Sequence, residues 1–221
     1  MSLQGWRDLT FLHWPVDVEA VGALLPPGLE VDTYEGSAWV GLTPFVMHRV
    51  RAPGLPAVPV LSTFGEVNLR TYVRDGTGGT GIWFLSLDCA RLATVAALRL
   101  LGLPYFWAAV RLTRTGRRIS YQARRRGTDV TMDVTVRVGH RLHQQDTLTT
   151  FLTGRWSGYT RRAGRLWRVP VEHEPWPLHR ATAESDVAGL PEAAGLPPVG
   201  GQPLVHFSPG VRTRLGAPRP V

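Results

Sequence analysis

Four polar side chains alternate with apolar residues in the stretch FGEVNLRTYV, residues 64–73. Successive side chains of a β-strand point to opposite faces, so Glu66, Asn68, Arg70 and Tyr72 share one face, with neighbours about 7 Å apart. On an outer sheet face such a row is merely solvated. Facing a closed cavity, an acid, an amide, a guanidinium and a phenol would form a binding site.

The neighbouring strands favour the cavity. Residues 38–47 and 82–87 are apolar on both faces. A polar row between such strands needs internal partners or a ligand. We therefore predict a pocket whose aromatic lining includes Trp14, Trp39 and Trp83, with Glu66 and Arg70 supplying polar recognition.

A second polar segment, VEHEPWPLHR, follows near the C-terminus. Its two histidines and two glutamates suggest a metal site, but Pro175 and Pro177 exclude the helical spacing that such ligands use. We predict instead a rigid loop that docks Trp176 and offers a histidine to the pocket rim. No metal and no cofactor is expected.

The basic composition of the chain does not by itself indicate nucleic-acid binding. All 25 basic residues are arginine, and the formal charge is +8. The densest arginine groups adjoin Gly116 and Gly127, where hairpin turns with solvated charges are expected, so nucleic-acid binding is the least favoured function. Because lysine is absent, no side chain can form a Schiff base with a carbonyl substrate.

Two other segments look like catalytic or cofactor-binding motifs, but the residues around them do not support that function. The segment at residues 76–81 matches G-x-G-x-x-G, but it leads into a strand instead of a helix and so predicts a hairpin. Asp88 is expected to cap the following helix, where the helix dipole could lower the pKa of Cys89. A lone buried cysteine is more often inert.

The periodicity of the chain predicts about ten strands and two or three helices. Helices are expected at residues 15–25, 91–101 and 146–152, with weak helical character at 180–195. The remaining apolar segments alternate or run as short strands joined by glycine turns. The expected fold class is α+β, a strongly curved, mainly antiparallel sheet that forms a cone or partial barrel with the helices outside.

The length and local composition of the chain limit the number of domains and the kinds of segment it can contain. We interpret the 221 residues as a single domain, 1–221, because no linker or repeat divides them. No apolar stretch is long enough to span a membrane and no leader pattern is present, so a cytoplasmic location is predicted. The oligomeric state stays open, a homo-oligomer included.

The longer segments carry a resemblance. The chain resembles the YqjF-like family of uncharacterised bacterial proteins, and more distantly the acetoacetate decarboxylase fold, through residues 11–45, 66–73, 81–108, 171–181 and 204–211. The resemblance implies a cone-like sheet around a buried pocket. It places Glu66 at the position of that enzyme's pocket glutamate and suggests Arg7 for its arginine. The catalytic lysine would fall near residues 88–93, where this chain has none.

The leading hypothesis is therefore a small-molecule pocket for an oxo acid or another small carboxylate, without Schiff-base chemistry. Arg70, Asn68 and Arg7 would contact the ligand. If the protein is an enzyme, it is expected to be a lyase or hydrolase that uses Glu66 as general acid or base. The alternatives are a non-catalytic sensor that uses the same pocket, and a nucleic-acid-binding protein.

Overall fold

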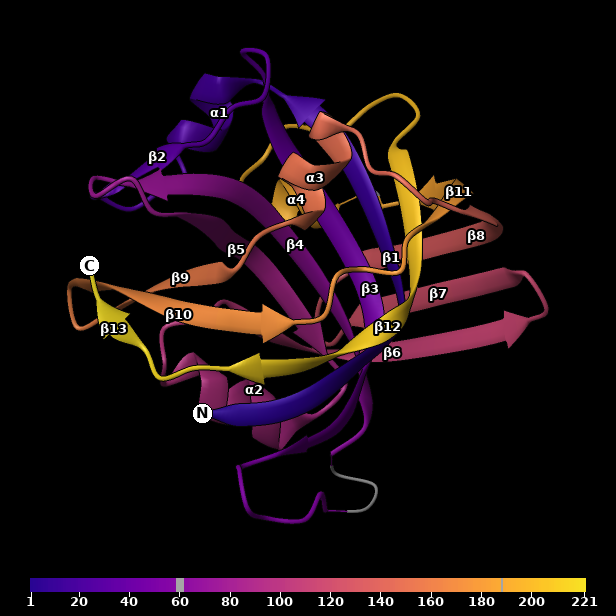
Figure 1. Cartoon of the computed structure of the whole chain (residues 1–221), viewed down its shortest axis with the longest axis horizontal. Helices are drawn as coiled ribbons and strands as arrows, with labels where there is room; N and C mark the ends of the chain where they lie inside the picture. Colours follow the sequence, from indigo (N-terminus) through magenta and orange to yellow (C-terminus); the bar gives the residue numbers. More distant parts are fainter. Residues whose placement is uncertain (59–61, 188) are drawn as a thin grey trace.

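The computed structural model describes residues 1–58, 62–187 and 189–221. In this part of the chain the helices are short: α1 (Val18–Gly22), α2 (Leu92–Arg99), α3 (Thr147–Thr153) and α4 (Leu190–Ala193). Thirteen strands make up most of the rest (Figure 1). They are β1 (Ser2–Val16), β2 (Leu29–Val31), β3 (Ala38–Arg51), β4 (Phe64–Asp75), β5 (Thr80–Cys89), β6 (Tyr105–Thr115), β7 (Arg118–Arg125), β8 (Thr131–Arg141), β9 (Ser157–Arg162), β10 (Arg165–His173), β11 (His179–Asp186), β12 (Leu204–Leu215) and β13 (Arg219–Pro220).

The strands form one sheet that closes on itself twice. Nine strands make a barrel in the order β5-β6-β7-β8-β11-β12-β1-β3-β4, which the β4–β5 pairing closes. A second, smaller ring of seven strands uses β9 and β10 to connect β5 to β12 and returns through β1, β3 and β4. In Figure 1, β6 to β8 lie on the right and β9 and β10 on the left of the shared strands. The predicted α+β fold with a strongly curved, mainly antiparallel sheet is confirmed.

Where both rings use the same part of a shared strand, that part has one face in each ring. On β4, Val67 and Leu69 are buried in a large apolar cluster with Leu42 of β3, Ile119 of β7 and Val134 of β8. This cluster fills the nine-strand barrel. The opposite face of the same strands looks into the seven-strand ring, so the alternation of β4 separates two interiors rather than an interior from solvent.

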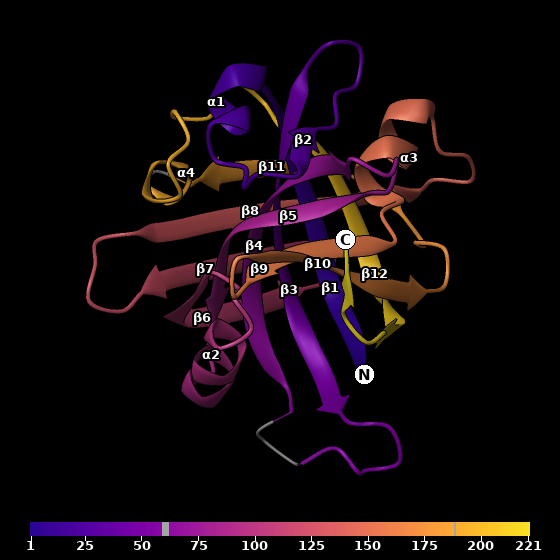
Figure 2. The same cartoon turned by 90° about the vertical axis from the view of Figure 1, so that its left-hand side faces the viewer.

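The helices lie outside the rings. Figure 2, which faces β9 and β10, shows α2 below these strands and β7 and β8 extending to one side. Among the described residues, no helix is both long and apolar enough to cross a membrane.

The first and last predicted helices are shorter in the structure, because strands take up part of their ranges. Residues 2–16 form β1, and the first helix begins only at Val18, with the Asp17 carboxylate accepting a hydrogen bond from the Ala20 amide. Residues 179–186 form β11, so the helix in that region shrinks to α4. Both strands are central in the sheet order, and pairing on two sides outweighs their mixed local patterns.

Asp88 and Arg125 also differ from expectation. Asp88 belongs to β5 and does not cap α2, which Arg91 precedes without a side-chain cap. Instead the Asp88 carboxylate accepts a hydrogen bond from Arg125 Nε at 3.0 Å, and Arg125 also donates to Ser86 Oγ. Arg125 is only 4% exposed, so it is a buried ion-pair partner and not a solvated turn residue.

Candidate functional site

The seven-strand ring encloses a cavity of about 770 Å³. Its walls come from β1, β3, β4, β5, β9 and β10, and α2 covers one side with Ala93, Thr94, Ala97 and Leu98. Most of the lining is apolar. Cavities of roughly 300–1,000 Å³ with few polar groups are typical of small-molecule sites.

The polar row of β4 faces this cavity. Glu66, Asn68 and Arg70 line it, with Glu66 2% and Asn68 9% exposed. Across the register, Phe45 lies opposite Glu66 and Phe84 lies opposite Arg70, and both aromatic residues line the same cavity. The row therefore supplies polar groups to a largely apolar chamber.

Among the described residues, Glu66 is the one carboxylic acid that lines this chamber. Burial raises the pKa of its carboxyl to about 7, although hydrogen bonds from Tyr105 and Asn68 act to lower it. The Tyr105 hydroxyl donates to both carboxylate oxygens, at 3.2 Å each. A carboxyl with a pKa near 7 can either donate or accept a proton at neutral pH.

Cys89 lies directly opposite Glu66 across the β4–β5 register, at the end of β5. Burial, with the nearby Glu66 carboxylate, raises the pKa of the Cys89 thiol to about 12. A helix dipole therefore does not lower the pKa of this thiol, because Cys89 ends a buried strand and does not begin a helix.

Arg70 brings a cation to the same wall. Its guanidinium carbon lies 5.3 Å from the centre of the Phe11 ring. Among the described residues Arg70 forms no ion pair with a carboxylate, and its Nε has no hydrogen-bond partner. Other buried atoms of the lining that lack a partner are Asn68 Oδ1, Trp6 Nε1 and Trp167 Nε1. A ligand would satisfy such atoms, since unpaired buried polar groups are costly.

Tyr72 ends the row and serves a structural purpose. Its hydroxyl donates to the Leu152 carbonyl at 2.9 Å and lies 2.7 Å from His13 Nε2. The hydroxyl therefore accepts from the Nε2–H of a neutral His13, whose pKa is held well below its usual value by burial and by Arg70. Gly41 leaves room for this contact, because a Cβ there would lie 3.0 Å from the His13 ring and 3.1 Å from the Tyr72 hydroxyl.

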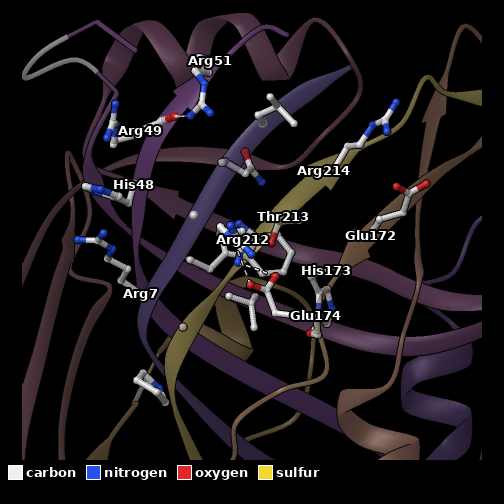
Figure 3. A pocket seen from close by; sticks show the side chains of 17 residues that line it. Arg7, His48, Arg49, Arg51, Glu172, His173, Glu174, Arg212, Thr213 and Arg214 are labelled. Carbon is white, nitrogen blue, oxygen red and sulfur yellow. Dashed lines mark hydrogen bonds and ion pairs between the residues drawn. The ribbon is translucent and has the colours of Figure 1, made fainter. Parts of the chain in front are cut away.

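The other predicted lining residues lie elsewhere. Trp14 is part of the filled nine-strand barrel, and Trp83 lies opposite Thr71 and so faces away from the polar row. Trp39 packs beside Tyr72 against a small cluster beyond the end of the row. Arg7 lines a groove on the outer surface (Figure 3). These predictions were wrong because the face of the strand on which each residue lies cannot be assigned before the strands themselves are known.

Apart from Trp176, the aromatic lining comes from residues that the sequence did not single out. The cavity is lined by Trp6, Phe45, Phe64, Phe84, Tyr105, Trp167 and Trp176. Trp176 was expected to dock its loop, and its Nε1 donates to the Thr153 carbonyl at 3.0 Å. His173 reaches the cavity rim, with its ring 4.5 Å from Trp176 and 4.6 Å from Trp156. Tyr105 begins β6 and lies opposite Leu87 in the parallel β5–β6 pairing, which the sequence does not reveal.

Comparison with known proteins identifies the family. Residues 3–212 match the DUF2071 family, described as "Uncharacterized conserved protein". The uncharacterized protein YqjF of Bacillus subtilis (strain 168) is 37% identical over 212 residues, which cover 93% of this chain and 86% of YqjF. The chain belongs to the DUF2071 family.

Comparison with solved structures shows which fold this chain has. The enduracididine biosynthesis enzyme MppR complexed with pyruvate superposes with a TM-score of 0.72 at 16% identity, covering 100% of this chain and 90% of that one. An acetoacetate decarboxylase-like enzyme from Sphingomonas wittichii RW1 gives 0.70 at 17% identity, covering 99% and 92%. Acetoacetate decarboxylase from Legionella pneumophila gives 0.69 at 14%, covering 99% and 87%. This chain therefore has the acetoacetate decarboxylase-like fold.

Proposed function

We propose that the cavity binds a small oxo acid or another small carboxylate, and that Glu66 transfers a proton to or from the bound molecule. The observation that carries this proposal is the row Glu66, Asn68, Arg70 on one wall of an apolar cavity. Among the described residues no ion pair neutralises the Arg70 guanidinium, which leaves its charge available to a ligand anion.

Arg70 would hold the carboxylate. A guanidinium presents paired N–H donors that match the two oxygens of a carboxylate, and the apolar surroundings strengthen that contact. The Cα atoms of Glu66 and Arg70 lie about 13 Å apart on an extended strand. The Arg70 side chain, a short ligand and the Glu66 side chain together fill this span, with Asn68 between them.

Glu66 would act at the other end of the ligand. Below pH 7 the protonated Glu66 carboxyl can donate a proton to a carbonyl oxygen of the ligand. Above pH 7 the carboxylate can accept a proton from the ligand carbon adjacent to that carbonyl. Tyr105 keeps the carboxyl oriented through its two hydrogen bonds. The reaction does not use a Schiff base on a side chain, because the sequence contains no lysine.

The relatives support the ligand class only indirectly. MppR has been solved with pyruvate, a small oxo acid, and two other neighbours are acetoacetate decarboxylase or resemble it. Such distant likeness establishes a fold and not an activity. The choice of an oxo acid therefore rests mainly on Arg70 and Glu66.

Binding of matched ligands tests the carboxylate contact. Calorimetry with a panel of 2-oxo and 3-oxo acids, each compared with the ketone that lacks the carboxylate, should show binding of the acids alone. Arg70→Gln should weaken that binding at least about tenfold, the equivalent of 1.4 kcal/mol. Arg74→Gln is the control, because Arg74 lies on the same strand but is half exposed and pairs with Glu30. Equal binding of acids and ketones would refute the proposal.

Turnover then separates an enzyme from a sensor. An acid that binds is incubated with the wild-type protein and with Glu66→Gln, and its products are followed by NMR. Product formed by the wild type alone supports proton transfer by Glu66, a lyase or hydrolase activity. Binding that survives Glu66→Gln, with no product from either protein, supports the non-catalytic sensor. A cytoplasmic location and a homo-oligomeric state stay predictions, to be tested by fractionation and sedimentation.

A further inference from the structure

A second hollow lies on the outer face of the sheet. It has a volume of about 770 Å³ and is formed by β1, β3 and β12 with the end of β10. Figure 3 shows Arg7, His48 and Arg49 gathered on one side and Glu172, His173 and Glu174 on the other, with Arg212 and Thr213 between them. One side of the rim is thus basic, whereas the other carries its two glutamates together with Arg212 and Arg214.

Two glycines produce the hollow. Gly5 of β1 lies between Arg212 on β12 and His48 on β3, so three strands meet where the central one has no side chain. Gly210, with φ +135°, lies opposite Arg7. A Cβ at Gly210 would come within 2.1 Å of the Trp6 carbonyl oxygen, so this position requires glycine.

A β-bulge collects the basic groups. Leu3 pairs with Arg51 and Gly5 with His48. Between these two pairs β3 therefore contains one residue more than β1. Arg49, at φ +52°, lies within the bulge, and Val50 turns inward to line the central cavity. The extra residue thereby leaves His48, Arg49 and Arg51 all bordering the outer groove.

The charges on the two sides are not equally compensated. Arg212 forms an ion pair with Glu174 at 3.2 Å, and Arg214 lies opposite Glu172 across β10 and β12. In the part of the chain that the structure describes, Arg7, Arg49 and Arg51 form no ion pair.

These charges converge on His48. Burial, then Arg7 and Arg49, lower the pKa of its imidazole. The guanidinium charges of Arg7 on β1 and Arg49 on β3 therefore both act on the same imidazole in the groove.

We propose that this groove is a second binding site, for a small molecule that carries a phosphate or diphosphate group. Three uncompensated guanidinium groups match a multiply charged anion, and the planar fork of arginine fits phosphate oxygens. On the opposite rim Glu174 is paired with Arg212, and Glu172 lies across from Arg214, so the uncompensated positive charge is confined to one side of the groove. A terminal phosphate fits this confined charge better than a continuous polyanion such as nucleic acid does. The remainder of the ligand, neutral or cationic, then lies toward the glutamates.

The groove is distinct from the oxo-acid cavity. Gln4, Trp6 and His173 contribute to both linings and form the wall between them. The basic groups of the groove lie on the outer side of this wall, whereas Glu66 and Arg70 lie on the inner side. The two proposals can therefore fail separately, and Glu66→Gln should leave phosphate binding unchanged.

Inorganic diphosphate is the probe for the first experiment. Calorimetry at low salt should show saturable binding that Arg49→Gln and Arg51→Gln each weaken about fivefold, since one solvent-exposed charge contact is worth at most about 1 kcal/mol. The double variant should lose about 25-fold. Arg118→Gln, an exposed arginine at the start of β7, is the control and should change the affinity less than twofold.

Three outcomes would overturn the proposal. These are an equal loss in Arg118→Gln, tighter binding of citrate than of diphosphate, and tighter binding of a DNA duplex than of diphosphate at the same ionic strength. NMR of the histidine imidazoles gives an independent readout, because an anion bound beside His48 raises its pKa. A His48 pKa that is unchanged at saturating diphosphate would place the anion elsewhere.

Discussion

The two rings share five strands and yet have opposite interiors. A barrel generally widens as strands are added, so the nine-strand ring should be the roomier. It is instead filled with apolar side chains, while the seven-strand ring holds the cavity of about 770 Å³. The choice of side chains on each face of the shared strands, and not the number of strands, decides which interior is hollow.

Polar groups show the same contrast. Inside the filled barrel, the Tyr121 hydroxyl donates to the Asp8 carbonyl and lies 2.9 Å from Thr10 Oγ1, and Asp88 pairs with Arg125. Around the cavity, Asn68 Oδ1 and Arg70 Nε have no partner in the described residues. The filled ring satisfies its own polar groups, whereas the hollow ring leaves some for a ligand.

The largest effect is expected from the buried ion pair of the filled barrel. Asp88→Asn leaves the Arg125 charge buried without its counter-ion, which should lower the free energy of unfolding by about 3–5 kcal/mol. Chemical denaturation with urea measures this loss. The double variant Asp88→Asn with Arg125→Met should recover much of it, and a double variant as unstable as the single one would contradict the explanation.

A matched pair of leucines compares the two interiors directly. Leu69 and Leu87 are each 1% exposed, but Leu69 belongs to the filled barrel and Leu87 lines the cavity. Leu69→Ala should cost about 3–4 kcal/mol because it opens a new void in packed surroundings. Leu87→Ala should cost only about 2 kcal/mol, since it enlarges an existing space. Equal losses in urea denaturation would mean that the cavity wall is packed as tightly as the filled core.

The alternation of β4 was predictable from its sequence, as was the presence of a polar face. The inference that Glu66, Asn68 and Arg70 face a cavity succeeded because the neighbouring strands are apolar on both faces. It used only local pattern and a burial argument. The fold class followed from the number and spacing of strands.

The aromatic lining could not be predicted in the same way. Trp14, Trp39 and Trp83 were chosen for residue type, but the ring that each one enters depends on register and strand order. β1 was missed altogether, and with it Trp6 and the outward direction of Arg7. Long-range pairing decides these positions, and a single sequence does not contain that pairing in readable form.

The pH dependence of stability tests the hollow ring. Because burial raises the pKa of Glu66 from 4.5 to about 7, the carboxyl favours the folded state fully below about pH 4.5, and this contribution is lost as pH rises to 7. Relative to Glu66→Gln, the wild type should lose about 3 kcal/mol between pH 4 and pH 8. Urea denaturation across this range measures the difference. Glu30→Gln, at an exposed position, is the control and should show no such trend.

The smallest effect concerns the tuning of Glu66 by its phenol. The Tyr105 hydroxyl donates to both oxygens of the Glu66 carboxylate and so favours its charged form. Tyr105→Phe removes this donor and should raise the pKa of Glu66 further, by roughly one pH unit, about 1.4 kcal/mol. Infrared titration of the buried carboxyl band follows the change, with Glu66→Gln identifying the band. Tyr159→Phe is the matched control, because Tyr159 donates to Asp75 and should leave the Glu66 band where it is. A pKa that falls in Tyr105→Phe would mean that water entering the vacated space solvates Glu66 better than the phenol does, and the cavity wall would then be wet at the acid.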